Sequence, residues 1–143
     1  MVISDIVSKS ADETRKIGKE FAKIVKKGEV VFLEGNLGAG KTEFVRGFVE
    51  YHGIKDIKSP SFTVVFEHQS ALGFPIYHID LYRFEGGYIE LLERGIIDLF
   101  EKRDGIALVE WADRIEGFYM PQYIVKFLHL SESERRIRIE KNF

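Results

Sequence analysis

Residues 29–43 read EVVFLEGNLGAGKTE, an apolar run that breaks into a glycine-rich loop and then into a helical pattern. The run Val30–Leu33 consists of β-branched or bulky apolar residues, which is typical of a strand buried on both faces. Behind the loop, four apolar residues recur on one side of a helix: Phe44, Val45, Phe48 and Val49. This stretch therefore predicts a buried strand, a loop and an amphipathic helix, in that order.

The loop Gly35–Thr42 fits the pattern G-x-x-x-x-G-K-[ST] of a phosphate-binding P-loop. Its glycines let the backbone N–H groups turn inward, and the start of the following helix adds partial positive charge that faces a phosphate. In such a loop the lysine, here Lys41, reaches the β- and γ-phosphates, and the hydroxyl of Thr42 ligates Mg²⁺. The alternative is a glycine-rich turn without a ligand, but the flanking strand and helix favour the P-loop.

The chain has the size and composition of one ordinary globular domain. With 143 residues, of which 45% are hydrophobic and 31% are charged, we expect a single domain over residues 1–143. The net charge of −2 argues against direct binding to nucleic acid, because neutralising phosphates requires a basic surplus. The absence of cysteine excludes disulfides and thiolate metal sites.

Neither a membrane span nor a targeting segment is visible in the sequence. No apolar stretch approaches the ~20 residues that a membrane-spanning helix needs. The first residues, Met1–Asp5, lack the basic and apolar regions of a signal peptide. We therefore expect a cytoplasmic location without membrane contact.

The rest of the chain alternates helical and strand-like patterns. Ser10 and Glu13 form a capping box at the start of a helix that Gly28 would stop. Strand patterns at 62–67 and 75–82 flank a turn signal, which predicts an antiparallel hairpin. Further expected elements are short helices over 88–94 and 96–103 and strands over 105–110, 123–130 and 135–140. We therefore expect an α/β fold of three layers, whose sheet is parallel at its centre and carries antiparallel additions.

Carboxylates at the ends of two strands are the candidates for a magnesium site beside the P-loop. Glu110 ends an apolar run in the manner of a Walker B strand, and the alternative is a solvated residue at a strand end. Further upstream, period-2 alternation places His78, Asp80 and Tyr82 on one face of a strand. His78 alone is more often simply hydrogen-bonded, and Asp80 could form a surface ion pair with Arg83. Beside a P-loop, however, the two carboxylates favour an Mg²⁺–nucleotide site.

Four sequence elements occur in the order and approximate spacing of one known family: Gly35–Thr42, Ser59–Thr63, Tyr77–Arg83 and Val109–Trp111. On these elements the chain resembles the TsaE family, the small ATPases of tRNA threonylcarbamoyladenosine biosynthesis, from about residue 10 to residue 139. The P-loop alone indicates only an NTPase, whereas the block H-x-D-x-Y-R followed by the pair E-W is much narrower. Asn36 stands where aspartate is frequent in the family, and this change removes no required group.

The resemblance implies a P-loop NTPase fold and a specific activity. Members of the family bind ATP with Mg²⁺, hydrolyse it slowly when alone, and act with TsaD and TsaB. Those partners place a threonylcarbamoyl group on the adenosine next to the anticodon, so that the chain meets tRNA only indirectly, through the complex. Except for Arg83, the sequence offers no obvious arginine finger, so we expect slow turnover that the partners stimulate.

Carried over by position, the resemblance assigns a nucleotide site residue by residue. Thr42 and Glu110 hold Mg²⁺, and Asp80 lies beside the γ-phosphate and the metal-bound water. The residues that carry hydrolysis are then Lys41, Asp80 and Glu110. The nucleotide-binding set consists of Thr14, Gly35, Asn36, Leu37, Gly38, Ala39, Gly40, Lys41, Thr42, Asp80 and Arg135.

The resemblance also implies moving parts and a base-binding end. Ser59–Thr63 would be a switch-like loop that senses the γ-phosphate, and the strand His78–Arg83 would carry the second switch. Thr14 and Arg135 lie near the adenine, where the alternative for Arg135 is a solvated arginine at a strand edge. Trp111, the only tryptophan, is either a core anchor or a residue close to the nucleotide or a partner.

Three alternatives to this ATPase also use a nucleotide site. A GTPase usually carries an [NT]-K-x-D loop after a strand, whereas the nearest stretch, Glu101–Asp104, lacks the amide or hydroxyl and precedes its strand. A small-molecule kinase needs a lid and an acceptor pocket, for which the chain has little spare length. A nucleotide-switched binding module of the same complex, in which hydrolysis is incidental, is the alternative that we retain beside the ATPase.

Overall fold

A computed structural model describes residues 1–36, 39–56, 65–82, 84–85 and 87–142 of the chain. These residues form seven strands, four α-helices and one 3₁₀ helix. In chain order the elements are β1 (Val2–Ser8), α1 (Ala11–Ala22), β2 (Val30–Glu34), α2 (Lys41–Tyr51), β3 (Val65–Gln69), β4 (Pro75–Asp80), α3 (Tyr88–Glu93), α4 (Ile96–Lys102), β5 (Ile106–Glu110), η1 (Ala112–Ile115), β6 (Tyr123–His129) and β7 (Arg135–Lys141).

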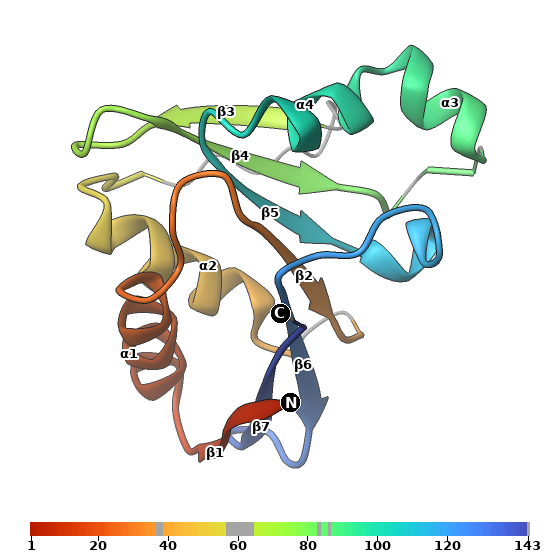
Figure 1. The fold of residues 1–143 in the computed structure, drawn as a ribbon. Helices are drawn as coiled ribbons and strands as arrows, with labels where there is room; N and C mark the ends of the chain where they lie inside the picture. Colours follow the sequence, from red (N-terminus) through yellow and green to blue (C-terminus); the bar gives the residue numbers. More distant parts are fainter. Residues whose placement is uncertain (37–38, 57–64, 83, 86, 143) are drawn as a thin grey trace.

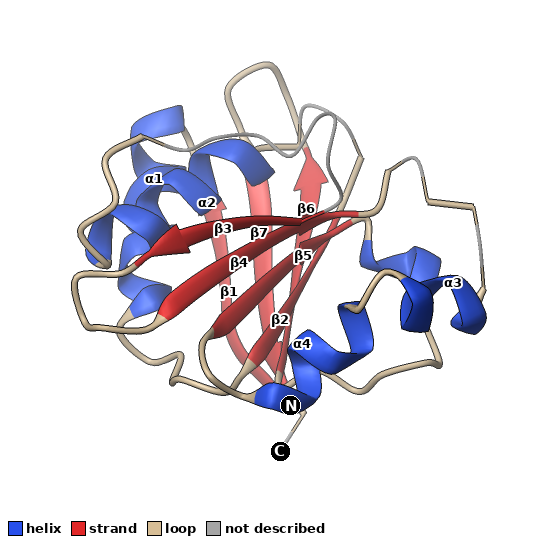
Figure 2. Cartoon of the chain, turned by 90° about the horizontal axis from the view of Figure 1, so that it is seen from above, coloured by secondary structure: helices blue, strands red, loops and turns tan. Residues whose placement is uncertain are grey.

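The strands form one sheet with the order β1-β7-β6-β2-β5-β4-β3. The four central strands β6, β2, β5 and β4 run parallel. At the edges, β7, β1 and β3 pair antiparallel with their neighbours. Figures 1 and 2 show α1 and α2 on one face of the sheet and α3 and α4 on the other. The predicted three-layer α/β fold with a parallel centre and antiparallel additions is therefore confirmed.

The central strand β2 is buried on both faces, as its run of apolar residues predicts. Val31 and Leu33 are fully buried in the core beneath α1 and α2, which includes Phe48. Val30 and Phe32 belong to the core on the other face, beneath α3, α4 and η1. Two separate hydrophobic cores therefore pack against β2, one on each face of the strand that leads into the P-loop motif.

Helices α1 and α2 approach each other through two glycines. A Cβ atom at Gly47 would lie 1.9 Å from the carbonyl oxygen of Arg15, and one at Gly18 would lie 2.1 Å from that of Phe44. Because both obstacles are backbone atoms, no side chain can turn aside to make room. The two glycines therefore set the short distance between α1 and the helix that follows the P-loop.

The first helix begins as expected and ends earlier than expected. The hydroxyl of Ser10 accepts a hydrogen bond from the N–H of Glu13 at 3.1 Å, but the Glu13 carboxylate accepts from the N–H of Lys9 rather than from Ser10. The helix ends at Ala22, so the prediction that Gly28 stops it is wrong. Gly28 instead adopts a φ of +92°, which turns the chain into β2.

The strand β1 is an element that the sequence pattern does not indicate. It forms the edge of the sheet and pairs antiparallel with β7, for example through Asp5 and Arg138. Most of its residues are exposed, since one side of the strand has no neighbour. A strand of this kind lacks the alternation of buried and exposed residues on which prediction depends.

Apart from the start of β3, the remaining elements lie within two residues of their predicted bounds. The antiparallel hairpin is confirmed, since β3 pairs with β4 through Val65 and Ile79. The predicted start of its first strand, 62–64, and the loop Ser59–Thr63 lie outside the described residues. Within the part of the chain that the structure describes, no helix combines the length and the apolar character that a bilayer crossing needs.

The contact between α1 and α2 predicts that Gly47 does not tolerate a side chain. We expect Gly47→Ala to lower the free energy of unfolding by about 1 to 3 kcal/mol, because the added methyl group forces the two helices apart. Urea unfolding followed by circular dichroism measures this change. Gly87→Ala is the control, since Gly87 has a negative φ and nothing within 4 Å of the added atom. Unchanged stability of Gly47→Ala would contradict the close packing.

Candidate functional site

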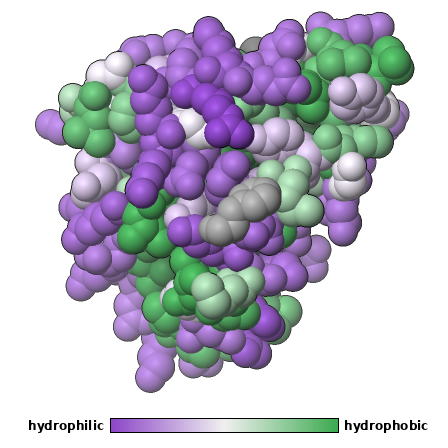
Figure 3. All heavy atoms as spheres, in the orientation of Figure 1, coloured by the Kyte–Doolittle hydropathy of each residue, from purple (hydrophilic) through white to green (hydrophobic). Residues whose placement is uncertain are grey.

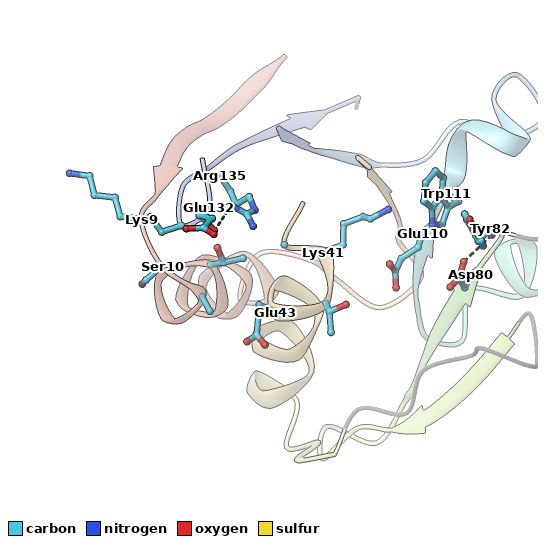
Figure 4. Close-up of a pocket in the computed structure, with 15 residues that line it drawn as sticks. Lys9, Ser10, Lys41, Glu43, Asp80, Tyr82, Glu110, Trp111, Glu132 and Arg135 are labelled. Carbon is cyan, nitrogen blue, oxygen red and sulfur yellow. Dashed lines mark hydrogen bonds between the residues drawn. The ribbon is translucent and has the colours of Figure 1, made fainter. Parts of the chain in front are cut away.

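A pocket of about 750 Å³ opens where the parallel strands end, beside the first turn of α2. Figure 4 shows Lys41 between the two ends of this pocket, one at Arg135 and the other at Trp111. The lining residues come from both halves of the chain: Lys9, Ser10, Ala11, Thr14, Gly40, Lys41, Thr42, Glu43, Asp80, Tyr82, Glu110, Trp111, Glu132, Ser133 and Arg135.

The loop between β2 and α2 brings the start of a helix to the pocket. Gly40 precedes the first residue of α2 with a φ of +96°, a conformation that residues with a side chain rarely adopt. The N–H of Ala39 donates to the carbonyl oxygen of Asn36 at 3.1 Å. Lys41 and Thr42 then form the first turn of the helix at the pocket wall.

Lys41 is a buried cation, with 5% of the residue exposed. Its Nζ donates to the carbonyl oxygen of Gly35 at 2.6 Å and lies 4.1 Å from the centre of the Trp111 ring. Burial lowers the pKa of Lys41, against the opposing effect of the carboxylates of Glu110 and Asp80. The partners of this buried ammonium are a carbonyl and an aromatic ring, so an anion bound in the pocket would stabilise its charge.

Asp80 and Glu110 lie side by side because the register of β4 and β5 pairs them. Burial raises the pKa of Asp80, against the hydrogen bond that its Oδ1 accepts from the N–H of Tyr82 at 2.9 Å. Nε2 of His78 lies 2.5 Å from Oε2 of Glu110, and both side chains are largely buried. The alternation predicted from the sequence thus directs Asp80 and Tyr82 to the pocket, and His78 contacts it through Glu110.

Trp111 contributes to the pocket and to the core at once. It directly precedes η1 with a φ of +57°, a left-handed conformation that is uncommon for a residue with a side chain. Its ring centre lies 4.9 Å from that of Tyr82, and the ring packs against the core beneath α3 and α4. The interpretation as a core anchor is therefore confirmed, and the same ring also contacts Lys41. Its closeness to a nucleotide or a partner stays a prediction.

The other end of the pocket is formed by α1 and by the turn between β6 and β7. Thr14 is buried, and its hydroxyl lies 2.7 Å from the hydroxyl of Ser8. Nη1 of Arg135 donates to the carbonyl oxygens of Ser131 at 2.7 Å and Glu134 at 3.0 Å. Arg135 is therefore bound to the turn instead of being a solvated residue at a strand edge. Its contact with adenine, and that of Thr14, stay predictions.

Seven of the predicted site residues line the pocket: Thr14, Gly40, Lys41, Thr42, Asp80, Glu110 and Arg135. Gly35, Asn36 and Ala39 lie in the loop that leads to the pocket and are not among its lining residues. Leu37 and Gly38, which the motif also predicts to bind phosphate, lie outside the described residues.

Sequence reasoning misses several lining residues, including Lys9, Glu43 and Glu132. Glu43 directly follows the P-loop motif, so its position is foreseeable, but its carboxylate pairs with Arg15 at 2.8 Å and with Arg46 at 2.5 Å. Glu132 belongs to a turn without any motif, and only the pairing of β6 with β7 carries it to the pocket. No local signal could have identified it.

The donors around Lys41 fit a magnesium ion bound together with phosphate. Among the described residues, no cluster of three or more His, Cys, Asp or Glu side chains could hold a metal ion. Mg²⁺ does not need one, because it keeps several waters and binds to one or two protein ligands beside phosphate oxygens. The Thr42 hydroxyl and the Glu110 carboxylate, which both line the pocket, match that donor set.

Comparison with known proteins identifies relatives over nearly the whole chain. The family model described as "Threonylcarbamoyl adenosine biosynthesis protein TsaE" matches residues 8–139. A protein from Aquifex aeolicus named tRNA threonylcarbamoyladenosine biosynthesis protein TsaE is 32% identical over 142 residues, which are 96% of each chain. The protein of the same name from Bacillus subtilis is 43% identical over 106 residues, which are 73% of this chain and 64% of that protein, so the match spans just under two thirds of this relative.

A solved structure has the same fold. The crystal structure of YdiB from Bacillus subtilis is similar with a TM-score of 0.76 and 35% sequence identity, over 97% of this chain and 86% of that one. Its likeness agrees with the mixed sheet whose centre is parallel. Since the family model covers most of the chain and the relatives exceed 30% identity over at least two thirds of it, the chain belongs to the TsaE family.

Proposed function

We propose that this chain binds ATP with Mg²⁺ and hydrolyses it slowly, and that it acts with TsaD and TsaB in forming threonylcarbamoyladenosine next to the anticodon of tRNA. The observation that carries this function is the buried ammonium of Lys41 at the start of α2, which shares one pocket with Asp80 and Glu110. The names of the TsaE relatives supply the pathway. In it, tRNA meets the chain only through the complex.

Each pocket residue has a role that follows from its chemistry. Lys41 stabilises the negative charge of the γ-phosphate in the transition state. Because Lys41 is buried, its electrostatic interaction with the phosphate is stronger than it would be in water. Asp80 accepts a hydrogen bond from the attacking water and orients it. Thr42 and Glu110 would hold Mg²⁺, which when bound neutralises charge on the β- and γ-phosphates. The contact with His78 fixes the orientation of the Glu110 carboxylate.

The placement of Asp104 favours ATP over GTP. A carboxylate that recognises guanine would have to reach the pocket, but Asp104 accepts a hydrogen bond from the hydroxyl of Tyr77 at 3.0 Å and pairs with Lys102 at 3.2 Å. It also precedes β5, whereas the pocket lies at the other end of that strand, where Glu110 stands. Comparing the Kd values of the two nucleotides tests this preference.

The arginines near the pocket support slow hydrolysis by the isolated chain. Arg135 is the one arginine among the described lining residues, and its guanidinium is bound to the carbonyls of the turn 131–134. Arg83, the candidate arginine finger, lies outside the described residues. Stimulation by the partners follows if they complete the site or rearrange it. The same observation favours a second candidate, a nucleotide-switched binding module of this complex in which hydrolysis is incidental.

Replacement of Lys41 tests the site directly. We expect Lys41→Ala to lower kcat for ATP hydrolysis at least about 100-fold, because it removes a buried charge that stabilises the transition state. Release of γ-phosphate, with and without TsaD and TsaB, measures the change. Lys27→Ala removes an exposed lysine outside the pocket and should leave the rate unchanged. Hydrolysis at the wild-type rate by Lys41→Ala would refute the assignment.

A variant of Glu110 separates the ATPase from the binding module. Glu110→Gln keeps an acceptor for His78 but no longer offers a charged ligand to Mg²⁺. If hydrolysis drives the cycle, modified tRNA should accumulate at least about tenfold more slowly over many turnovers in a reconstituted reaction. Modification at the full rate, with nucleotide binding retained, would favour the module.

The raised pKa of Asp80 predicts that this carboxylate costs stability. The folded chain then holds the proton more tightly than the unfolded chain, so stability falls as the pH rises from the ordinary pKa of 3.8 through the raised value. We expect Asp80→Asn to increase the free energy of unfolding at pH 7 on the order of 1 kcal/mol, and to lose this advantage below the ordinary pKa. Urea unfolding over a range of pH values measures it.

Asp104 provides the matched control of opposite sign. Although burial opposes it, the hydrogen bonds from Tyr77 and Lys102 hold the pKa of Asp104 below its ordinary value. Asp104→Asn should therefore destabilise the chain at pH 7 and cease to do so at acid pH. The Asp80 interpretation would be wrong if both variants changed stability in the same direction.

A further inference from the structure

An apolar patch lies on the outer side of α3, away from both cores. It consists of four large side chains with substantial exposure: Tyr88 at 44%, Ile89 at 67%, Leu92 at 41% and Phe118 at 42%. We call this set the α3 patch. The ring centres of Tyr88 and Phe118 lie 5.8 Å apart, so the helix and the segment after η1 form one surface. Figure 3 shows apolar residues gathered over the region of α3, at the upper right of the molecule.

The α3 patch is connected to the pocket by two chain segments that run from Tyr82 to α3 and from Trp111 to Phe118. Residues of the two segments are in contact at three places between the pocket and the patch. At the pocket, the rings of Tyr82 and Trp111 lie 4.9 Å apart. Between pocket and patch, Nη1 of Arg114 donates to the carbonyl oxygen of Phe84 at 3.3 Å. At the patch, the ring of Tyr88 contacts the ring of Phe118, which is the third contact.

The two segments that carry the α3 patch contain more acidic than basic residues. The segments 84–94 and 112–118 carry five carboxylates, Glu85, Glu90, Glu93, Asp113 and Glu116, against the two guanidinium groups of Arg94 and Arg114. One of these carboxylates, Glu90, pairs with Arg94 at 2.9 Å. An acidic rim repels nucleic acid and anionic lipid, which both carry negative charge. It attracts a protein surface whose own rim is basic.

We propose that the α3 patch is the docking surface for a protein partner whose contact area is apolar at its centre and ringed by lysine and arginine. Exposed apolar clusters of this kind mark interaction sites when polar residues surround them. The aromatic side chains Tyr88 and Phe118 are the residue types that anchor such interfaces. Through the three contacts described above, a partner seated here acts on the segments that hold Tyr82 and Trp111 at the pocket.

This docking surface rests on the proposed function in one respect: the partner probe is purified TsaD with TsaB. We expect Ile89→Asp, which places a charge at the most exposed side chain of the patch, to raise the Kd for TsaD–TsaB at least about tenfold in biolayer interferometry. Glu93→Lys should raise the Kd several-fold, and more at low salt than at high salt, because it inverts a charge of the rim. Both variants should keep the basal rate of ATP hydrolysis and lose stimulation by the partners.

Two matched variants serve as controls outside the patch. Leu72→Asp changes a leucine that is 62% exposed in the turn between β3 and β4, and Glu101→Lys inverts an exposed charge near the end of α4. Neither should alter the Kd or the stimulation. Circular dichroism of all four variants verifies the fold, which is expected to persist because every changed side chain is exposed.

Three results would overturn the docking surface. One is wild-type affinity of both Ile89→Asp and Glu93→Lys for TsaD–TsaB. A second is self-association of the wild type that Ile89→Asp abolishes in sedimentation velocity, since the patch would then bind a second copy. The third is a wild-type chain that hydrolyses ATP but does not bind TsaD–TsaB. In this last case the Lys41→Ala test still stands for the ATPase, so the two failures are distinguishable.

Discussion

The candidate site depends on one interaction, the burial of the Lys41 ammonium at the start of α2. Its contacts with the Gly35 carbonyl and the Trp111 ring hold it at the ends of the parallel strands. Burial disfavours this charge, and the nearby carboxylates of Glu110 and Asp80, from β5 and β4, oppose that effect without forming an ion pair with it among the described contacts. Because these groups come from three segments, the site forms only when the parallel centre of the sheet is complete.

Burial acts on the two signs of charge in opposite directions. It lowers the pKa of Lys41 and raises the pKa of Asp80, so both charged forms are disfavoured relative to water. Rigid surroundings are needed to keep them in place. The backbone contacts at Gly18 and Gly47 provide these for α2, and the two cores provide them for β2. Stability of the scaffold thus offsets what the pocket costs, as is usual for functional sites.

Much of this arrangement could be predicted because it follows from local patterns in the sequence. The apolar run Val30–Leu33, the glycine loop and the alternation around Asp80 each encode an element within a few residues. The Lys41–Trp111 contact could not be predicted, since it joins segments far apart in the chain. The contacts of Arg135 are local, but they belong to a turn that carries no sequence motif. Strand β1 escapes prediction for a related reason: only its pairing with β7 makes it a strand.

The Trp111 ring offers a physical route by which a partner could alter the proposed hydrolysis. Lys41 has two competing sets of contacts, the carbonyl and ring that it touches here and the phosphate that we propose it binds. A partner changes the balance only if it binds more tightly to one arrangement than to the other. Trp111 is packed against Tyr82, and their two segments meet again at Phe118. A partner that displaces Phe118 would therefore act on the ring that competes with phosphate for the ammonium.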